Sequence, residues 1–299
     1  MISEADAAFY RENGYLVVEN VYAPEEVKAM RDALAGLIDK ARGLTDHDSI
    51  YDLEPGHTPE NPRVRRIKKP FEADAVFRDM VEHPNLIAIL SKIVSPDLRL
   101  HGGKINIKAA EYGSPVEWHQ DWAFYPHTND DVLAVGVLLD DTSEENGPLM
   151  VMPGSHKGPT YDHHVDGHFA GAMDPSACDL DFSKAVALTG KAGSCTFHHV
   201  RAVHGSAQNT SGRDRQLLLY QIAAADAWDL RGLPSSWEEN ESRMIAGTST
   251  LTPRVVDCPV RLPYPKAKRE GSIYENQTAL KNRYFAFDPK AGSKVAAAE

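Results

Sequence analysis

Two histidines and one aspartate in this sequence have the residue types and the spacing of a metal site. His119 and Asp121 stand two residues apart in the segment 117–122, Glu-Trp-His-Gln-Asp-Trp. If this segment is a strand, side chains at positions i and i+2 point to the same face, so the imidazole and the carboxylate form half of a chelate. His204, at the end of an apolar stretch, is the best candidate for the third ligand. Two histidines and one carboxylate with open coordination positions form the facial triad that binds Fe(II).

Arg215 extends this pattern, because it follows His204 by eleven residues and opens the apolar run 216–221. The turn formers at 209–212, Asn-Thr-Ser-Gly, predict that the second run folds back beside the first. The guanidinium would then lie near the metal end of the sheet, where its planar fork matches a carboxylate bidentately. The four residues together indicate a dicarboxylic co-substrate that chelates iron at one end and meets Arg215 at the other.

The elements that must hold these residues change in character along the chain. The first 95 residues read mainly as helix, with a short strand at 15–18 and a polar loop at 44–62. Helices are predicted at 5–13, from Pro24 to about 43, and at 73–94 with a break near Pro84. From Leu98 onward, short β-type runs separated by turn formers appear at 98–108, 132–139, 149–152, 184–188, 194–199 and 216–223. Many short strands without helices between them predict a sandwich or a barrel.

Composition excludes several classes of protein. The chain has 32 Lys and Arg against 43 Asp and Glu, a net charge of -11, which argues against a nucleic-acid binder. No apolar run is long enough for a transmembrane helix, and the N-terminal residues show no secretory signal. The three cysteines are too scattered for a disulfide framework, so a cytoplasmic location is the simplest prediction. The oligomeric state is not predicted.

Several motifs, taken in order, resemble those of a known family. The matching stretches are His119-Gln-Asp121, Glu145-Asn-Gly147, Pro153-Gly-Ser-His-Lys-Gly158, and His204-Gly-Ser-x-Gln-Asn209 with Arg215. The segment 9–18 and the Pro-Glu-Glu helix start after it also match. Over roughly residues 7–223 the sequence resembles the phytanoyl-CoA dioxygenase family of Fe(II)- and 2-oxoglutarate-dependent oxygenases.

The resemblance implies a mainly β fold with flanking helices, built on a double-stranded β-helix (a jelly-roll, cupin-like core). It implies one oxygenase domain over 1–299, with a mostly helical support at 1–97, the jelly roll at 98–223 and an irregular covering segment at 224–299. It also implies Fe(II), 2-oxoglutarate and O2 as cofactor and co-substrates, and hydroxylation of a small molecule with succinate and CO2 as co-products. The implied iron ligands are His119, Asp121 and His204; the implied 2-oxoglutarate contacts are Arg215, Gln120 and Ser206.

Two aromatic residues and two cations are candidates for substrate contact. Trp122 and Phe124 flank the metal motif, although packing against the barrel explains them as well. Arg66 belongs to 63–69, a strongly basic run that fits a solvated face or a site for an anionic substrate such as a phosphonate, a carboxylate or a CoA ester. Lys108 is the fourth candidate.

Lys108 alternates with Lys104 and Asn106 on one face of the run 98–108. A polar inner face near an active site and a solvated edge strand explain this alternation equally well. The long segment 155–182 is predicted to be a mobile flap over the pocket, because long structureless loops in compact domains are often lids.

Other functions remain open from the sequence alone. The same triad also serves desaturation, epoxidation or ring formation. A jelly-roll binding protein without turnover is a third hypothesis, although the complete triad with Arg215 favours catalysis. A zinc hydrolase could use the same three ligands, but it would not need Arg215 and would work without O2.

Overall fold

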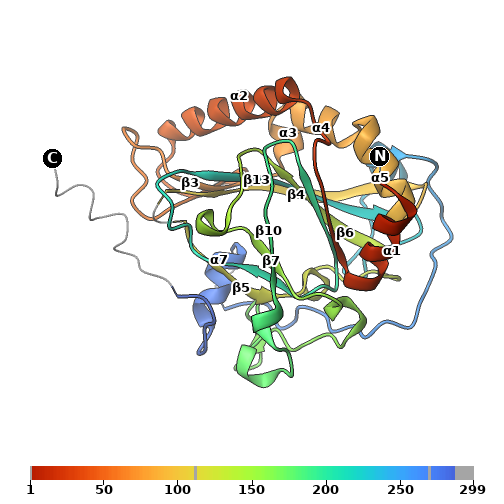
Figure 1. Ribbon diagram of the computed structural model, residues 1–299. Coiled ribbons are helices and arrows are strands. Elements are labelled where there is room, and N and C mark those ends of the chain that lie inside the picture. Colours follow the sequence, from red (N-terminus) through yellow and green to blue (C-terminus); the bar gives the residue numbers. More distant parts are fainter. Residues whose placement is uncertain (1, 111–112, 269–270, 287–299) are drawn as a thin grey trace.

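The computed structural model describes residues 2–110, 113–268 and 271–286, and two antiparallel sheets form its centre (Figure 1). The larger sheet contains, in spatial order, β1 (Tyr15–Val18), β11 (Cys195–His199), β6 (Val132–Leu138), β13 (Arg215–Ala224), β4 (Leu98–Lys108), β3 (Val64–Lys68) and β2 (Tyr51–Leu53), and β14 (Met244–Ala246) pairs with β4. The smaller sheet contains β10 (Val186–Leu188), β7 (Leu149–Val151), β12 (His204–Ser206) and β5 (Val116–His119). The predicted jelly-roll class is confirmed.

Helices cover the outer face of the larger sheet, on the side away from the smaller one (Figure 1). They are α1 (Glu4–Asn13), α2 (Pro24–Lys40), α3 (Pro70–Ala73), α4 (Ala75–Val81) and α5 (Pro84–Ile93). α2 begins at Pro24, as predicted, and buries Val27, Met30, Leu34 and Leu37 at helical spacing. This helical layer covers one face of the larger sheet, so the opposite face is available for the functional site.

Alternation along β6 separates the two faces of the larger sheet. Leu133, Val135 and Val137 belong to the core shared with the helices, whereas Ala134 and Leu138 pack with residues of β13 on the opposite face. All seven residues of β6 are buried, as expected for a central strand covered on both sides.

Two strand registers position the residues of the predicted site. In the smaller sheet, His204 of β12 pairs with His119 of β5. In the larger sheet, Arg215 of β13 pairs with Lys108 of β4. The first register brings the two histidines together from positions 85 residues apart in the sequence, and the second brings two cations together.

The structure departs from the predicted elements in three places. β2 lies inside the predicted loop 44–62, and β3 is formed by the basic run 63–69. The segment 155–182 contains a small hairpin of β8 (His164–Val165) and β9 (His168–Phe169). The C-terminal region adds β14 and two short helices, α6 (Trp237–Ser242) and α7 (Ile273–Asn276), to its mainly irregular course.

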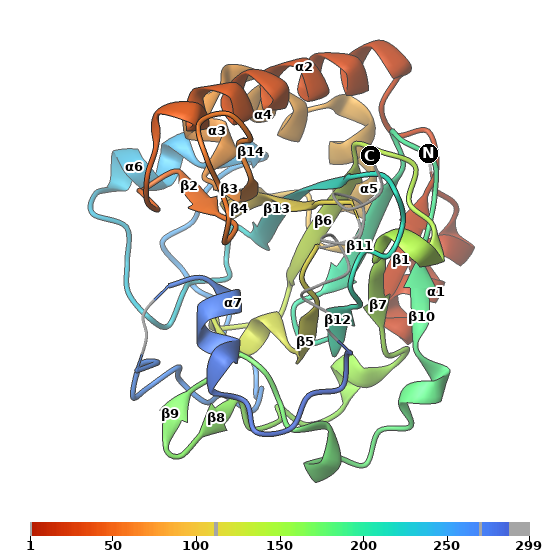
Figure 2. The ribbon, with the colours of Figure 1, turned by 90° about the vertical axis from the view of Figure 1, so that its left-hand side faces the viewer.

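The remaining regular segments are short 3-10 helices in connections: η1 (Ala41–Gly43), η2 (Asp121–Ala123), η3 (Glu144–Asn146), η4 (Ser155–Lys157), η5 (Pro175–Ala177), η6 (Phe182–Lys184) and η7 (Gln277–Ala279). Figure 2 shows α7 beside β5 and below β2 and β3. Over the described ranges, no helix has both the length and the apolar character needed to span a membrane.

Candidate active site

The three predicted metal ligands converge at the end of the smaller sheet. His119 is the last residue of β5, Asp121 opens η2, and His204 is the first residue of β12. One potential ligand atom of each lies within 4.8 Å of the others, and all three residues are buried. The Nε2 atom of His119 lies 3.9 Å from Oδ1 of Asp121, and the two imidazole centroids are 4.1 Å apart. The predicted constellation therefore exists as a compact cluster.

Backbone carbonyls hold both imidazoles in an orientation that suits metal binding. Nδ1 of His119 lies 2.8 Å from the carbonyl oxygen of Glu117, and Nδ1 of His204 lies 2.9 Å from that of Ala202. If Nδ1–H donates to the carbonyl in each case, the lone pair of Nε2 is free for a metal. Each histidine thus contacts the residue two positions before it, which leaves its other nitrogen facing Asp121.

The surroundings keep the cluster in the protonation state that a cation requires. Burial lowers the pKa of His119 to about 4, and burial together with the neighbouring His119 lowers the pKa of His204 well below its usual value. Burial alone would raise the pKa of Asp121, but the proximity of His198 and His204 holds it well below the ordinary range. Two neutral imidazoles and one carboxylate are the deprotonated ligands that Fe(II) needs, so these residues fit the ion.

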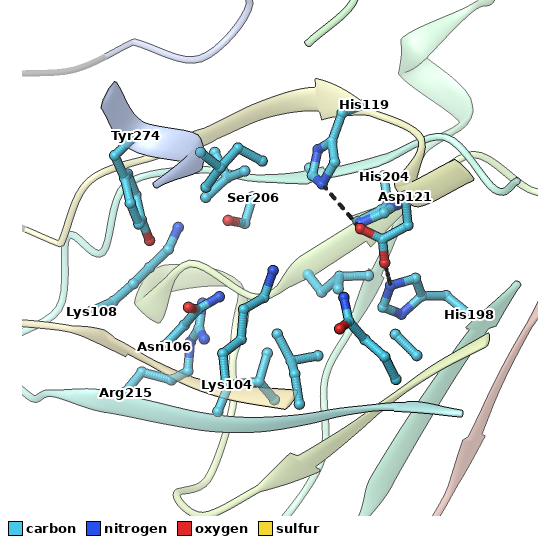
Figure 3. Close-up of a pocket in the computed structure, with 18 residues that line it drawn as sticks. Lys104, Asn106, Lys108, His119, Asp121, His198, His204, Ser206, Arg215 and Tyr274 are labelled. Carbon is cyan, nitrogen blue, oxygen red and sulfur yellow. Dashed lines mark ion pairs between the residues drawn. The ribbon is translucent and has the colours of Figure 1, made fainter. Parts of the chain in front are cut away.

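His198 is a further histidine at this site, and it was not among the residues predicted from the sequence. Its Nε2 lies 3.7 Å from Oδ2 of Asp121, and its ring stands 4.3 Å from that of His204. It lies on β11 and lines the cavity from the larger sheet (Figure 3). His198 therefore orients Asp121 from the side opposite His119.

Two buried cations occupy the far end of the cavity (Figure 3). Arg215 donates from Nη2 to the carbonyl of Gly147, and Lys108 donates to the carbonyl of Ala207. Gly147 has a φ of 70°, and a Cβ there would lie 2.7 Å from the carbonyl oxygen of Ala207, so the Glu-Asn-Gly motif needs glycine at this position. This turn therefore places the carbonyl of Gly147 where the Arg215 guanidinium can donate to it.

The two cations are poised for an anion. Burial lowers the pKa of Arg215 to about 10, and burial with the nearby Arg215 lowers the pKa of Lys108 well below its usual value. Within the part of the chain that the structure describes, neither has a carboxylate within 4.0 Å, and Nε of Arg215 and Oδ1 of the adjacent Asn106 lack hydrogen-bond partners. Uncompensated buried charges are costly. A carboxylate placed between Lys108 and Arg215 would remove that cost, so this end of the cavity fits one end of 2-oxoglutarate.

The other predicted co-substrate contacts differ from each other. Ser206 lines the cavity, next to the cation pair (Figure 3). Gln120 does not: its amide donates to the carbonyls of Pro159 and Arg201 and accepts from the backbone of Tyr161. His119 and Asp121, on either side of Gln120, face the proposed metal site. Because side chains alternate along an extended segment, Gln120 points the other way. The structure therefore gives Gln120 a role in anchoring a loop.

The four substrate candidates are spread over three environments. Trp122 is fully buried, packs in a separate apolar cluster and donates from Nε1 to the carbonyl of Pro259, so it lies away from the cavity. Lys108 lies beside Arg215, which places it with the co-substrate residues. Phe124 and Arg66 line a second pocket that adjoins the first. The alternation of Lys104, Asn106 and Lys108 is thus a polar inner face.

The cover of the cavity comes from a different segment than predicted. No described residue of 155–182 lines the main cavity or the adjoining pocket; the β8–β9 hairpin instead packs through Phe169 on Phe124. Ile273 and Tyr274 of α7 line the cavity. The guanidinium of Arg65 stacks 4.4 Å above the Tyr274 ring and forms an ion pair with Glu275. α7 thus lines the cavity where no local sequence signal predicted it, and a mobile flap at 155–182 stays a prediction.

Comparisons with known proteins agree with this geometry. A family model described as Phytanoyl-CoA dioxygenase (PhyH) matches residues 10–217. The chain is 39% identical over 280 residues to a probable alpha-ketoglutarate-dependent hypophosphite dioxygenase of Stutzerimonas stutzeri. The alignment covers 92% of this chain and 97% of that protein. It is 29% identical over 230 residues to an L-proline trans-4-hydroxylase of Streptomyces griseoviridis, covering 70% of this chain and 82% of that one.

Solved structures show the same fold. The crystal structure of EctD from S. alaskensis with bound Fe aligns with a TM-score of 0.66 at 24% identity, covering 85% of this chain and 87% of that one. The ligand geometry, the buried cation pair and the relatives lead to one conclusion. The chain belongs to the phytanoyl-CoA dioxygenase (PhyH) family, and it is an Fe(II)- and 2-oxoglutarate-dependent dioxygenase that acts on a small molecule.

Proposed function

We propose that His119, Asp121 and His204 bind the iron, and that Arg215 and Lys108 bind the distal carboxylate of 2-oxoglutarate. The observation that carries this assignment is the arrangement of one cavity with a two-histidine, one-carboxylate cluster at one end and two buried, uncompensated cations at the other. Iron and 2-oxoglutarate, when bound, supply with O2 the oxidising chemistry, and succinate and CO2 are the co-products.

The chain's own residues position and shield the reactants. Ser206 offers a hydroxyl beside the cation pair, and Tyr274 covers this end of the cavity. The side chains of Leu217 and Leu219 form an apolar floor on β13, which limits water around the co-substrate. On the metal side, the Phe124 ring stands edge-on to His119 at 5.8 Å and restricts its movement.

We further propose that the reaction is hydroxylation of a small, polar substrate. Two relatives support this reading, because their names specify hypophosphite and L-proline as small substrates. The identity to the hypophosphite enzyme extends over nearly the whole of both chains, so small phosphorus oxyanions are the first substrates to test. Desaturation and ring formation on the same site are the alternatives. The free thiols of Cys178, Cys195 and Cys258 are consistent with the predicted cytoplasmic location, which stays a prediction.

The experiment that tests this function begins with the metal-free protein under anaerobic conditions. Fe(II) and then 2-oxoglutarate are added, and the visible absorption of the chelate is recorded. O2 is then admitted with hypophosphite or L-proline, and succinate and the oxidised product are measured by mass spectrometry. We expect the chelate absorption, succinate in proportion to product, and one oxygen atom from 18O2 in the product. With L-proline, a product without 18O would indicate desaturation or ring formation; a protein that forms no chelate would refute the assignment.

A further inference from the structure

A second pocket opens beside the metal ligands, and cations dominate its charged lining. Its polar and aromatic lining includes Arg66, Lys104, Arg231, Phe124, Tyr125 and Gln221. Asp121 is the sole carboxylate among the described residues that line it, and this carboxylate belongs to the proposed iron site. Because Lys104 and Asp121 also line the main cavity, the second pocket meets the first one at the metal.

Lys104 is the central residue of this junction. It lies on β4, and Figure 3 shows its ammonium reaching into the space between the cation pair and the metal ligands. Throughout the described residues, no acceptor lies within hydrogen-bonding distance of Nζ and no carboxylate within 4.0 Å of it. β4 therefore brings an ammonium without an ion-pair partner to the junction of the two pockets, beside the space proposed for 2-oxoglutarate.

Each of the two arginines of the pocket forms an ion pair with an aspartate that lies outside the pocket. Arg66 forms an ion pair with Asp52 at 2.6 Å, and its Nε atom is buried without a partner. Arg231 contacts Asp229 through both Nε and Nη2, at 3.0 and 2.6 Å. Neither aspartate lines the pocket. The carboxylates thus fix the two guanidinium groups in place, while the faces directed at the pocket remain available for a ligand.

We propose that this second pocket is an oxyanion site, in which Lys104, supported by Arg66 and Arg231, binds the charged group of the substrate. The proposal rests on the proposed function and defines its substrate as a small molecule with a compact anionic group, either a phosphorus oxyanion or a carboxylate. Charge-assisted hydrogen bonds from an ammonium and two guanidinium groups suit such a group. A neutral substrate would leave Lys104 unpaired.

Position explains why an anion bound here would be oxidised. Lys104 contacts both pockets, and Asp121 is shared in the same way. In a small oxyanion, the P–H or C–H bond is only one or two bonds from the charged oxygens. Anchoring those oxygens on Lys104 therefore holds this bond beside the metal ligands, in a pocket that the rings of Phe124 and Tyr125 also line.

The test uses full-length protein loaded anaerobically with Fe(II) and 2-oxoglutarate. Hypophosphite, methylphosphonate, acetate and L-proline are titrated separately, and binding is followed as a perturbation of the visible absorption. KM values for each compound and for 2-oxoglutarate are then measured from succinate formation. The variants are Lys104→Met, which removes the charge but keeps the stem, Lys104→Arg, which keeps the charge, and Lys184→Met as the matched control. Lys184 is exposed at the surface, with 76% of its side chain accessible.

We expect Lys104→Met to raise Kd and KM for the preferred oxyanion about 10- to 100-fold, the usual effect of losing a hydrogen bond to a charged group. The KM for 2-oxoglutarate should change less than about twofold, Lys104→Arg should recover most of the affinity, and Lys184→Met should match the wild type. Preference for hypophosphite or methylphosphonate over acetate would identify a phosphorus oxyanion, and the reverse order a carboxylate.

Two results would overturn the oxyanion site while leaving the enzyme class intact. One is a wild-type chelate that forms normally but responds to none of the oxyanions. The other is a Lys104→Met enzyme whose KM rises for 2-oxoglutarate alone, which would place Lys104 in the co-substrate site. Failure of the wild-type protein to form the chelate is a separate outcome, because it refutes the proposed function itself.

Discussion

Among the described residues, two clusters contain two histidines and one aspartate, yet their surroundings differ. The first is His119, Asp121 and His204; the second is His101, His127 and Asp229. In each cluster the potential ligand atoms lie within 4.8 Å of one another. His127 even repeats the orientation of the first cluster, with Nδ1 2.7 Å from the carbonyl of Tyr125 and a buried Nε2 that has no partner.

The two clusters differ in how close an arginine lies to the carboxylate. Arg231 donates from its side chain to both carboxylate oxygens of Asp229 and from its backbone N–H to one of them, and these contacts outweigh burial and lower the pKa of that group. Arg99 adds a second positive charge that lowers the pKa of both His101 and His127. In contrast, Arg215 lies at the far end of the main cavity and makes no contact with Asp121.

The comparison teaches that ligand types and spacing are insufficient to define a metal site. A cation binds where the carboxylate is uncommitted and where neighbouring positive charges are few. The first cluster meets these conditions more closely, because Asp121 contacts His198 rather than an arginine, and Lys104 lies near it without forming an ion pair. The second cluster is already neutralised within the protein. We therefore expect one iron per chain, and the predictions below test that assignment.

The largest effect is expected from exchanging one histidine in each cluster. His204→Ala should reduce iron affinity and succinate formation by more than the roughly 10- to 100-fold typical of losing a ligand's supporting contact. His127→Ala should retain one iron per chain. Metal content after dialysis, measured by atomic absorption, and succinate formation check both variants. Equal loss of iron in the two variants would show that the second cluster also binds metal.

The histidines of the second cluster should make the metal-free protein sensitive to acid. Burial lowers the pKa of His127 from 6.5 to about 4, so between these values the unfolded chain binds a proton that the native protein does not. The folded protein therefore keeps its full free energy of unfolding above pH 6.5, and the part that depends on neutral His127 is lost as the pH falls towards 4. The difference in pKa corresponds to about 3 kcal/mol of unfolding free energy.

Urea unfolding of the metal-free protein at several pH values measures this loss. His127→Gln should make the dependence shallower over the same interval, because glutamine does not titrate. An identical slope in wild type and variant would mean that His127 is already protonated in the native protein, and the argument for a neutral cluster would fail.

Substitution of Arg215 is expected to have an intermediate effect, on the KM for 2-oxoglutarate. Arg215→Ala should raise the KM for 2-oxoglutarate about 10- to 100-fold, because a buried charge-assisted contact is lost, while iron content stays at one per chain. Arg213→Ala is the matched control, since that side chain is exposed two positions away on the same segment. An unchanged KM in Arg215→Ala would show that another residue binds the distal carboxylate.

Sequence reasoning located the first cluster because its signals are local or recur as motifs. His119 and Asp121 are neighbours in the sequence, and the strand run 98–108 coincides with β4 (Leu98–Lys108). Alternation along β4 also indicated the polar inner face, although the sequence alone did not distinguish it from an exposed edge. Glycine in the Glu-Asn-Gly turn is likewise readable, because its backbone must take a positive φ.

Other features were missed because their causes lie far apart in the chain. The basic run 63–69 forms β3 because Arg66 pairs with Asp52 and Arg65 with Glu275, the latter 210 residues away. Arg65 also stacks on Tyr274, which lines the cavity. Burial and pairing of charges depend on the tertiary structure, and one sequence contains no local pattern for them. Gln120 was assigned to the co-substrate from the family resemblance, and its hydrogen bonds to distant backbone groups have no local sequence signal.

The smallest effect is expected from freeing the aspartate of the second cluster. Arg231→Gln removes the guanidinium hydrogen bonds to Asp229 and one positive charge but keeps the backbone N–H contact, so the cluster should gain affinity for Co(II) by about tenfold, equivalent to about 1.4 kcal/mol. Arg99 remains nearby, which should keep this site weaker than the first. Co(II) titration followed by visible absorption can separate the two sites. If Arg231→Gln shows no second Co(II) site even at high metal concentration, the arginine is not what prevents binding, and the separation and rigidity of His101 and His127 must be the cause.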